Sequence, residues 1–208
     1  MLTTEEWARS LGISTAHRPP AVEGYQDPCP FTARLVATRA VILQGVVAVA
    51  AEVDPEPVIE WYQDQGVWEH VTPRERAFLA APSTVDQDQL RRFSWQAEAE
   101  WTLLWVVDKV ESLGLPTRQC ESRRLVDEII PALGSELDPF LSSAALRPPG
   151  LLLAEDDRHY NLWCYLHSAI RRGESQPDDL NYGVLWQRVR AFEWLQGITP
   201  WDEVEGDA

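Results

Sequence analysis

A run of mostly large hydrophobic residues lies near the middle of the chain, at residues 101–107. Only Thr102 is polar in this run, so a helix there is apolar on nearly every side and has to be surrounded by other elements. Ser94 suits an N-cap, and Gly114 suits a left-handed residue after the last turn. Charged residues toward both ends of the segment argue against a membrane span. The pattern therefore predicts a central, soluble helix over residues 94–113.

Helical spacing of apolar residues also covers much of the remaining chain. Apolar positions three and four apart over residues 31–53 predict a long helix. A second helix is predicted to begin with Asp54 as N-cap and Pro55 as first residue, and others span 151–172 and 183–195. The sequence contains neither strand alternation nor a repeat of fixed period. We therefore predict an all-α, single-domain bundle of about seven or eight helices around the central apolar helix.

The most specific local signal is the segment Thr72-Pro-Arg-Glu75. The Thr72 side chain can accept a hydrogen bond from the Glu75 amide, and the Glu75 side chain can reach back to the Thr72 amide. Pro73 suits the first helical position, because its missing N–H has no partner there anyway. The segment predicts the start of a short helix that ends at Pro82.

The two ends of the chain differ from its middle. Residues 1–30 contain prolines at positions 19, 20, 28 and 30, and proline disfavours helix for itself and for the residue before it. This composition predicts an N-terminal arm that lies on the body. Residues 31–200 form the predicted all-α domain, and the acidic residues 201–208 form a predicted loose tail.

Composition and charge restrict the classes of partner. The chain has 208 residues, 45% of them hydrophobic and ten of them tryptophan, which is typical of a globular protein with a substantial core. Nucleic-acid binding draws its affinity from lysine and arginine that neutralise phosphates, and the formal net charge of −15 disfavours it. A basic protein is the macromolecular partner that this charge favours.

Cysteine usage and the N-terminal residues indicate the compartment. Cys29, Cys120 and Cys164 are odd in number and widely spaced, which fits neither a disulfide framework nor a zinc knuckle. The first residues are acidic and do not form a secretory signal. We expect a cytoplasmic protein without membrane association, and the sequence does not indicate its oligomeric state.

Several groups of residues along the predicted helices form distinctive local patterns. They are Arg39-Ala-Val, Val71-Thr-Pro-Arg-Glu75 with Phe78-Leu79, Phe93-Ser-Trp-Gln-Ala-Glu98-Ala with Leu104-Trp105, and Arg188 with Ala191, Trp194 and Leu195. With these residues the chain resembles the bacterial domain-of-unknown-function family 4272 over most of residues 31–197. The helix at 158–170 departs from the family's more frequent pattern of Tyr-Arg-x-His-Trp-Ala-x-Arg-Asp-Ala. The resemblance implies a domain extent and no activity.

Three charged residues, Arg39, Glu98 and Arg188, lie inside apolar stripes of the predicted helices. A lone buried charge is costly, so each of them has to pair with another of the three, with Asp108 or Glu193, or with a bound anion. One interpretation is a fixed network that holds the helices in register. The other is an arginine-lined pocket for a carboxylate or a phosphate.

Motifs of known chemistry are absent from the sequence, including glycine-rich phosphate loops, nucleophile elbows and zinc-protease motifs. Cys164 and His167 are close to one turn apart and could ligate a metal or act as nucleophile and base. No third ligand or orienting carboxylate accompanies them, so ordinary packing is the favoured interpretation. We predict no catalytic, cofactor-binding or metal-binding residue.

Two classes of function follow from these observations. The first is a non-enzymatic, acidic helical module that binds a basic protein, as small bacterial immunity or secretion-adaptor proteins do. The alternative is a small-anion-binding protein or enzyme with an arginine-lined site in the helical core. A deep pocket favours the second class, whereas a filled core with exposed tryptophan and an acidic patch favours the first.

Overall fold

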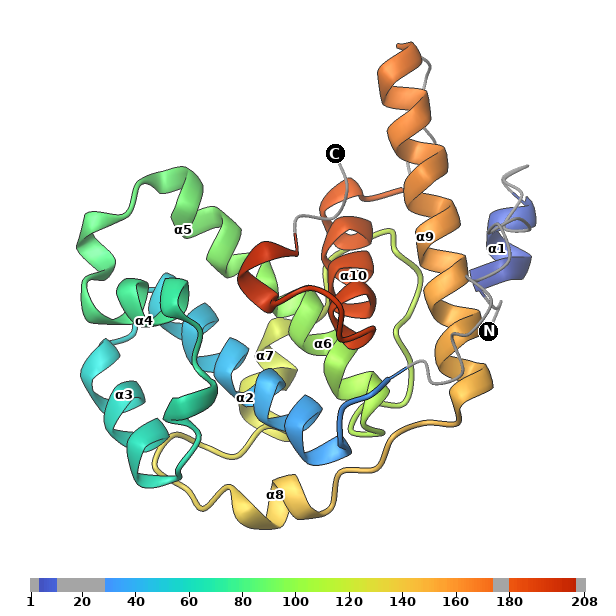
Figure 1. The fold of residues 1–208 in the computed structure, drawn as a ribbon. Helices are drawn as coiled ribbons and strands as arrows, with labels where there is room; N and C mark the ends of the chain where they lie inside the picture. Colours follow the sequence, from blue (N-terminus) through green and yellow to red (C-terminus); the bar gives the residue numbers. More distant parts are fainter. Residues whose placement is uncertain (1–3, 11–28, 174–179, 205–208) are drawn as a thin grey trace.

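The computed structural model of the chain describes residues 4–10, 29–173 and 180–204. All regular elements in these ranges are helical, which confirms the predicted all-α fold (Figure 1). The α-helices are α1 (Thr4–Ser10), α2 (Ala33–Ala50), α3 (Pro55–Asp64), α4 (Pro73–Ala80), α5 (Gln87–Ser94), α6 (Gln96–Val106), α7 (Ser122–Arg124), α8 (Asp138–Ser142), α9 (Pro149–Arg172) and α10 (Tyr182–Leu195). Single turns complete the fold: η1 (Trp68–His70), η2 (Pro82–Thr84), η3 (Leu125–Ile129) and η4 (Trp201–Glu203).

Helix α6 is the central element, and every one of its residues is buried. It packs mainly against α2 on one side and α10 on another, and α10 in turn packs against α9 (Figure 1). The hydrophobic run that predicted a central helix therefore lies in the core. Apolar burial is the dominant favourable term in folding, so a helix that is buried on all sides contributes strongly to the stability of the fold.

The central helix is shorter at its C-terminal end than the predicted span of 94–113. It ends because Asp108 adopts a left-handed conformation with φ of 58°. The Lys109 amide then donates to the Leu104 carbonyl at 2.8 Å, which closes the helix in the manner of a Schellman motif. Arg147 donates to the Trp105 carbonyl at 2.7 Å and pairs with Asp108, so the last turn is also covered by a cation.

The N-terminal end of α6 also differs from the prediction. Ser94 is the last residue of α5 and donates to the Arg91 carbonyl, so it does not cap α6. Helix α5 begins at its own capping box, in which Asp86 and Gln89 satisfy each other's amides. Trp95 joins the two helices, and α6 has no side-chain cap there.

Helix α2 begins at Thr32, whose hydroxyl accepts a hydrogen bond from the Leu35 amide at 3.2 Å. By length and composition it is the one helix within the described ranges that could cross a membrane, and 61% of it is buried inside the fold. Its residues Gly45 and Val41 contact α3 through Tyr62. The Tyr62 hydroxyl accepts from the Gly45 amide at 2.9 Å and donates to the Val41 carbonyl at 2.8 Å.

The C-terminal segment is part of the body up to Val204. Trp201 and Val204 are buried, and Asp202 accepts hydrogen bonds from the Thr72 hydroxyl at 2.7 Å and the Arg74 amide at 3.0 Å. The predicted loose tail of 201–208 is thus wrong for its first four residues, because Asp202 caps α4. The last four residues lie outside the described ranges.

The predicted N-terminal arm is only partly described. Helix α1 contacts α9, and Ala8 is fully buried there. Residues 11–28, which contain most of the prolines, lie outside the described ranges.

The contact between Gly45 and Tyr62 generates a stability prediction. A Cβ atom on Gly45 would lie 2.0 Å from the Tyr62 hydroxyl oxygen, so Gly45→Ala has to displace the ring and break its hydrogen bonds. We expect a loss of roughly 1–3 kcal/mol in the free energy of unfolding, measured by urea denaturation. Gly150→Ala in α9 is the matched control, because its Cβ meets no atom within 4 Å. Equal losses for the two variants would contradict this packing.

Candidate functional site

The structure brings two of the three predicted charges together. Arg188 is 1% exposed, and its Nε and Nη2 groups lie 2.8 and 2.7 Å from Glu98 Oε1. The remaining N–H groups reach the Leu113 carbonyl at 2.7 Å, the Gly114 carbonyl at 2.8 Å and His159 Nε2 at 3.1 Å. All five guanidinium donors are therefore used by the protein itself. Arg188 has none left for a ligand.

The groups around this pair are held in fixed protonation states. Burial, reinforced by the Arg188 charge, lowers the pKa of His159 to about 3, so the ring is neutral. Its Nδ1 lies 2.8 Å from the Glu155 carbonyl and donates to it, which leaves Nε2 to accept from Arg188. The second Glu98 oxygen accepts from the Cys120 amide at 2.7 Å. Burial raises the pKa of the Cys120 thiol far above its usual range, so the thiol is unreactive.

Arg39 lies in a different ion pair. It is buried and hydrogen-bonds Glu75, which is also buried, rather than Glu98. The other Glu75 oxygen accepts from the Thr72 amide at 3.0 Å, and the Thr72 hydroxyl accepts from the Glu75 amide at 3.2 Å. The predicted capping box at the start of α4 is thus confirmed. Its glutamate has a second task, because it also neutralises Arg39.

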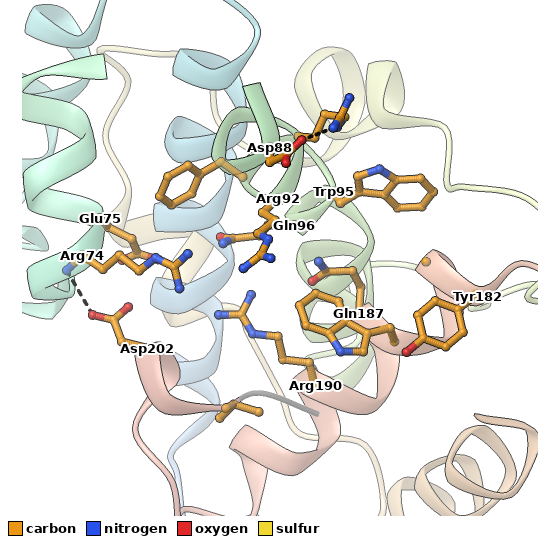
Figure 2. A pocket seen from close by; sticks show the side chains of 15 residues that line it. Arg74, Glu75, Asp88, Arg92, Trp95, Gln96, Tyr182, Gln187, Arg190 and Asp202 are labelled. Atoms are coloured by element: carbon orange, nitrogen blue, oxygen red, sulfur yellow. Dashed lines mark hydrogen bonds and ion pairs between the residues drawn. The ribbon is translucent and has the colours of Figure 1, made fainter. Parts of the chain in front are cut away.

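A cavity of about 650 Å³ lies beside the Arg39–Glu75 pair. Its walls come from α4, α5, the first residue of α6, α10 and the C-terminal turn η4 (Figure 2). The volume lies within the range of about 300–1,000 Å³ that is typical of small-molecule sites. We call this cavity the arginine pocket, because Arg74, Arg91, Arg92 and Arg190 all line it.

Helical spacing on α10 explains which residues face the pocket. Gly183, Gln187 and Arg190 are four and three residues apart and share one face of the helix. Arg188 lies two residues before Arg190, so it points away from the pocket and into the contact with α6 and α9. The absence of a side chain at Gly183 lets the Trp95 ring approach the helix, since a Cβ there would lie 2.7 Å from Trp95 Cζ3.

Arg190 is the most unusual charge in the pocket. It is only 6% exposed. Its guanidinium donates a hydrogen bond to the Trp201 carbonyl at 3.1 Å and contacts the rings of Trp186 and Trp201. Its Nε has no hydrogen-bond partner within the described part of the chain. A buried guanidinium normally has a carboxylate in bidentate contact, and Arg190 makes no such ion pair with any described residue.

Several charges act on Arg190 at once. Burial lowers its pKa to about 10, and the charges of Arg39 and Arg74 act in the same direction. Glu75 and Asp202 oppose this effect. Around Arg190, the positive charges of Arg39, Arg74 and Arg190 itself thus outnumber the negative charges of Glu75 and Asp202 by one. Arg92 adds a further positive charge to the pocket.

The acids in the pocket are already engaged. Asp202 is bound to the start of α4, and Asp88 pairs with Arg91 in the first turns of α5. The guanidinium groups of Arg74 and Arg92 make no ion pair with any described residue. Figure 2 shows the side chains of Arg74, Arg92 and Arg190 directed toward the same space. The pocket therefore has hydrogen-bond donors and positive charge that the protein does not neutralise.

Two glutamine side chains add to these donors. Gln96 and Gln187 are buried and line the pocket, and Figure 2 shows them beside Arg92 and Arg190. Gln96 Oε1 and both polar atoms of the Gln187 amide have no partner among the described residues. Burying an amide without hydrogen bonds costs roughly 1–3 kcal/mol. A polar ligand in the pocket would recover part of that cost.

Residues that could hold a metal ion are not clustered within the described ranges, where no group of three His, Cys, Asp or Glu side chains meets. Cys164 and His167 lie on α9, and the ring of His167 stacks on Trp163 with centroids 5.0 Å apart. The guanidinium and amide groups that line the arginine pocket suit it to binding an anion.

The sequence alone does not distinguish the pocket residues, for a physical reason. Arg190, Gln96 and Gln187 lie within predicted helices, but no stripe pattern distinguishes them from solvated polar residues. Gln96 carried the one usable signal, since it lies between Trp95 and Glu98 in the segment that supported the family resemblance. A buried position next to a large ring leaves an amide little water.

Comparisons with known proteins support the family and nothing beyond it. The model of a family described as Domain of unknown function (DUF4272) matches residues 1–204. No curated protein and no solved structure matches the chain.

The Arg188–Glu98 pair generates a first prediction about stability. Glu98→Ala leaves Arg188 buried without its carboxylate, so we expect a loss of roughly 3–5 kcal/mol in the free energy of unfolding. Glu98→Gln keeps the shape and part of the hydrogen bonding, and its loss is expected to be smaller. Asp138→Ala removes an exposed partner of Arg34 and should cost under about 1 kcal/mol. Urea denaturation that gives Glu98→Ala the same cost as Asp138→Ala would contradict a structural role for the buried pair.

Glu100 generates a prediction about pH. It is fully buried in α6, and neither carboxylate oxygen has a partner among the described residues. Burial raises its pKa well above 4.5, so the folded protein holds this proton more tightly than the unfolded chain does. The contribution of protonated Glu100 to the free energy of unfolding is therefore fully present below the pKa that Glu100 has in the unfolded chain. It is lost as the pH rises through the higher pKa that Glu100 has in the folded protein.

Glu100→Gln removes this loss, because the amide does not ionise. We expect the variant to be more stable than the wild type at neutral pH, with a difference that grows from about pH 5 to about pH 8. Thermal unfolding at several pH values measures it. Glu60→Gln on the exposed face of α3 is the control for the loss of one carboxylate. A wild type and a Glu100→Gln variant with parallel pH profiles would argue against a buried, protonated Glu100.

Proposed function

We propose that the chain, which belongs to the DUF4272 family, is a small-anion-binding protein whose site is the arginine pocket. The ligand on this proposal carries a phosphate or carboxylate group, because planar guanidinium groups bind both in bidentate geometry. Arg74, Arg92 and Arg190 are the residues that we assign to the anion.

One observation carries the proposal. Arg190 is almost completely buried, lines a cavity and makes no ion pair with any described residue. Retaining an unpaired charge in that environment costs free energy, which pairing with a bound anion would return. Arg188 serves as the internal comparison, because its environment is equally buried and it is completely hydrogen-bonded by the protein.

The other class of function, binding of a basic protein, does not draw on this pocket. Such a partner would be attracted by the net charge of −15 and repelled by the arginines that surround the cavity. Small-anion binding is therefore the function that the pocket supports better. A basic partner, if one binds, would use another face.

Anion binding generates a ligand-dependent stability prediction. Inorganic phosphate or pyrophosphate should raise the melting temperature of the wild type by mass action. At a ligand concentration of one hundred times the dissociation constant, the free energy of unfolding should rise by about 2.7 kcal/mol. Sodium chloride at matched ionic strength is the control for simple screening of the acidic surface. No difference between phosphate, pyrophosphate and chloride would argue against the proposed site.

Two variants and a matched control locate the site. Arg92→Ala removes an exposed side chain, so the unliganded protein should keep its stability within about 0.5 kcal/mol while phosphate binds about tenfold more weakly. Arg190→Gln should abolish the phosphate-dependent shift. Arg123→Ala, on the exposed α7, removes one positive charge away from the pocket and should leave the shift unchanged. An equal loss in Arg123→Ala and Arg92→Ala would reduce the effect to net charge.

A further inference from the structure

The arginine pocket has two chemically different ends. Figure 2 shows Arg74, Arg92 and Arg190 on one side, and Trp95 and Tyr182 on the other. We call these the arginine end and the aromatic end. Guanidinium groups bind phosphates, and aromatic side chains stack on flat rings. Such a pocket is suited to a ligand with an anionic group at one end and a planar ring at the other.

A polar group lies between the two ends. The Gln187 side chain is 1% exposed and lines the pocket, and neither Nε2 nor Oε1 of its amide has a partner among the described residues. An amide of this kind offers one donor and one acceptor side by side. The edge of a purine base presents the complementary pair, which is how glutamine recognises adenine in nucleic acids.

The aromatic end is held in place by the backbone of α10. A Cβ on Gly183 would lie 2.7 Å from Trp95 Cζ3, so the ring rests directly against the helix. Trp186, from the next turn of α10, lines the pocket as well and is contacted by the Arg190 guanidinium at 5.7 Å. Rings fixed in this way stack on a ligand at a small cost in side-chain entropy.

We infer that the ligand is a purine nucleotide. Its phosphate binds at the arginine end, and its base lies at the aromatic end with one edge hydrogen-bonded to Gln187. The inference rests on the proposed anion-binding function and deepens it by assigning the rest of the ligand. It also accounts for the uncompensated Gln187 amide, which a simple phosphate site leaves unexplained.

Titration calorimetry of the full chain with four probes tests the inference. The probes are AMP, UMP, ribose 5-phosphate and adenosine. AMP should bind roughly tenfold or more tightly than ribose 5-phosphate, because only AMP pairs with Gln187 and stacks on the rings. Adenosine lacks the phosphate and should bind at least about tenfold more weakly than AMP. UMP should bind between AMP and ribose 5-phosphate.

Two variants separate the base contact from the anion contact. Gln187→Leu should weaken AMP binding roughly tenfold and leave ribose 5-phosphate binding unchanged. Its unliganded melting temperature should equal or exceed that of the wild type, since an unpaired buried amide is removed. Tyr182 is 39% exposed, so Tyr182→Ala should fold normally and weaken AMP more than ribose 5-phosphate. Arg92→Ala should weaken both ligands to the same extent.

The outcomes distinguish the two proposals. If AMP and ribose 5-phosphate bind equally well and Gln187→Leu affects neither, the nucleotide assignment is overturned while anion binding stands. If none of the phosphorylated probes binds, and inorganic phosphate does not stabilise the protein, both proposals fail. If adenosine binds as tightly as AMP, the arginine end has no role in binding, and both proposals fail as well.

Discussion

A helix that is buried on every side has no solvent face for its polar groups, and this constraint shapes the whole protein. Helix α6 carries four residues with polar side chains at such positions: Gln96, Glu98, Glu100 and Thr102. Thr102 donates to the Glu98 carbonyl one turn earlier, which costs little. The other three need a partner from another element, a proton or a ligand. Each of them is treated differently by the fold.

Glu98 obtains a partner that is itself completely satisfied. Arg188 spends its five donors on Glu98, on two loop carbonyls and on His159, so α6, α9, α10 and the loop after α6 are connected through one guanidinium. Glu100 has no such partner, and burial shifts it toward its neutral form. Gln96 lies at the start of α6 and lines the arginine pocket. The end of the core helix is thus also the floor of the candidate site.

Local sequence patterns predict part of this arrangement. The apolar run of α6, the capping box at Thr72 and Glu75, and the burial of the three charges could all be read from spacing. The break after Val107 could not, because the left-handed residue there is Asp108 and not glycine. The partner of Arg39 was missed since Glu75 already had a local task as a helix cap.

The pocket itself could not be predicted from one sequence, because two segments far apart in the chain, residues 74–96 and 182–204, build it. The turn η4 illustrates the difficulty. Its residues Trp201 and Asp202 belong to a short acidic segment whose composition is typical of a loose tail. Only the folded chain shows that the Trp201 ring lies beside both Arg39 and Arg190, and that Asp202 caps α4.

The contrast between the acidic chain and its basic pocket bears on how a ligand is chosen. At physiological salt, charges more than about 8 Å apart in solvent are largely screened, so most of the −15 acts weakly on the pocket interior. The arginines act at contact distance and partly out of water, where the interaction of two charges is several times stronger. The acidic surface therefore disfavours large polyanions, which have to approach across it. A small anion inside the cavity would meet mainly Arg74, Arg92 and Arg190, so the proposed anion-binding function is compatible with the acidic composition of the chain.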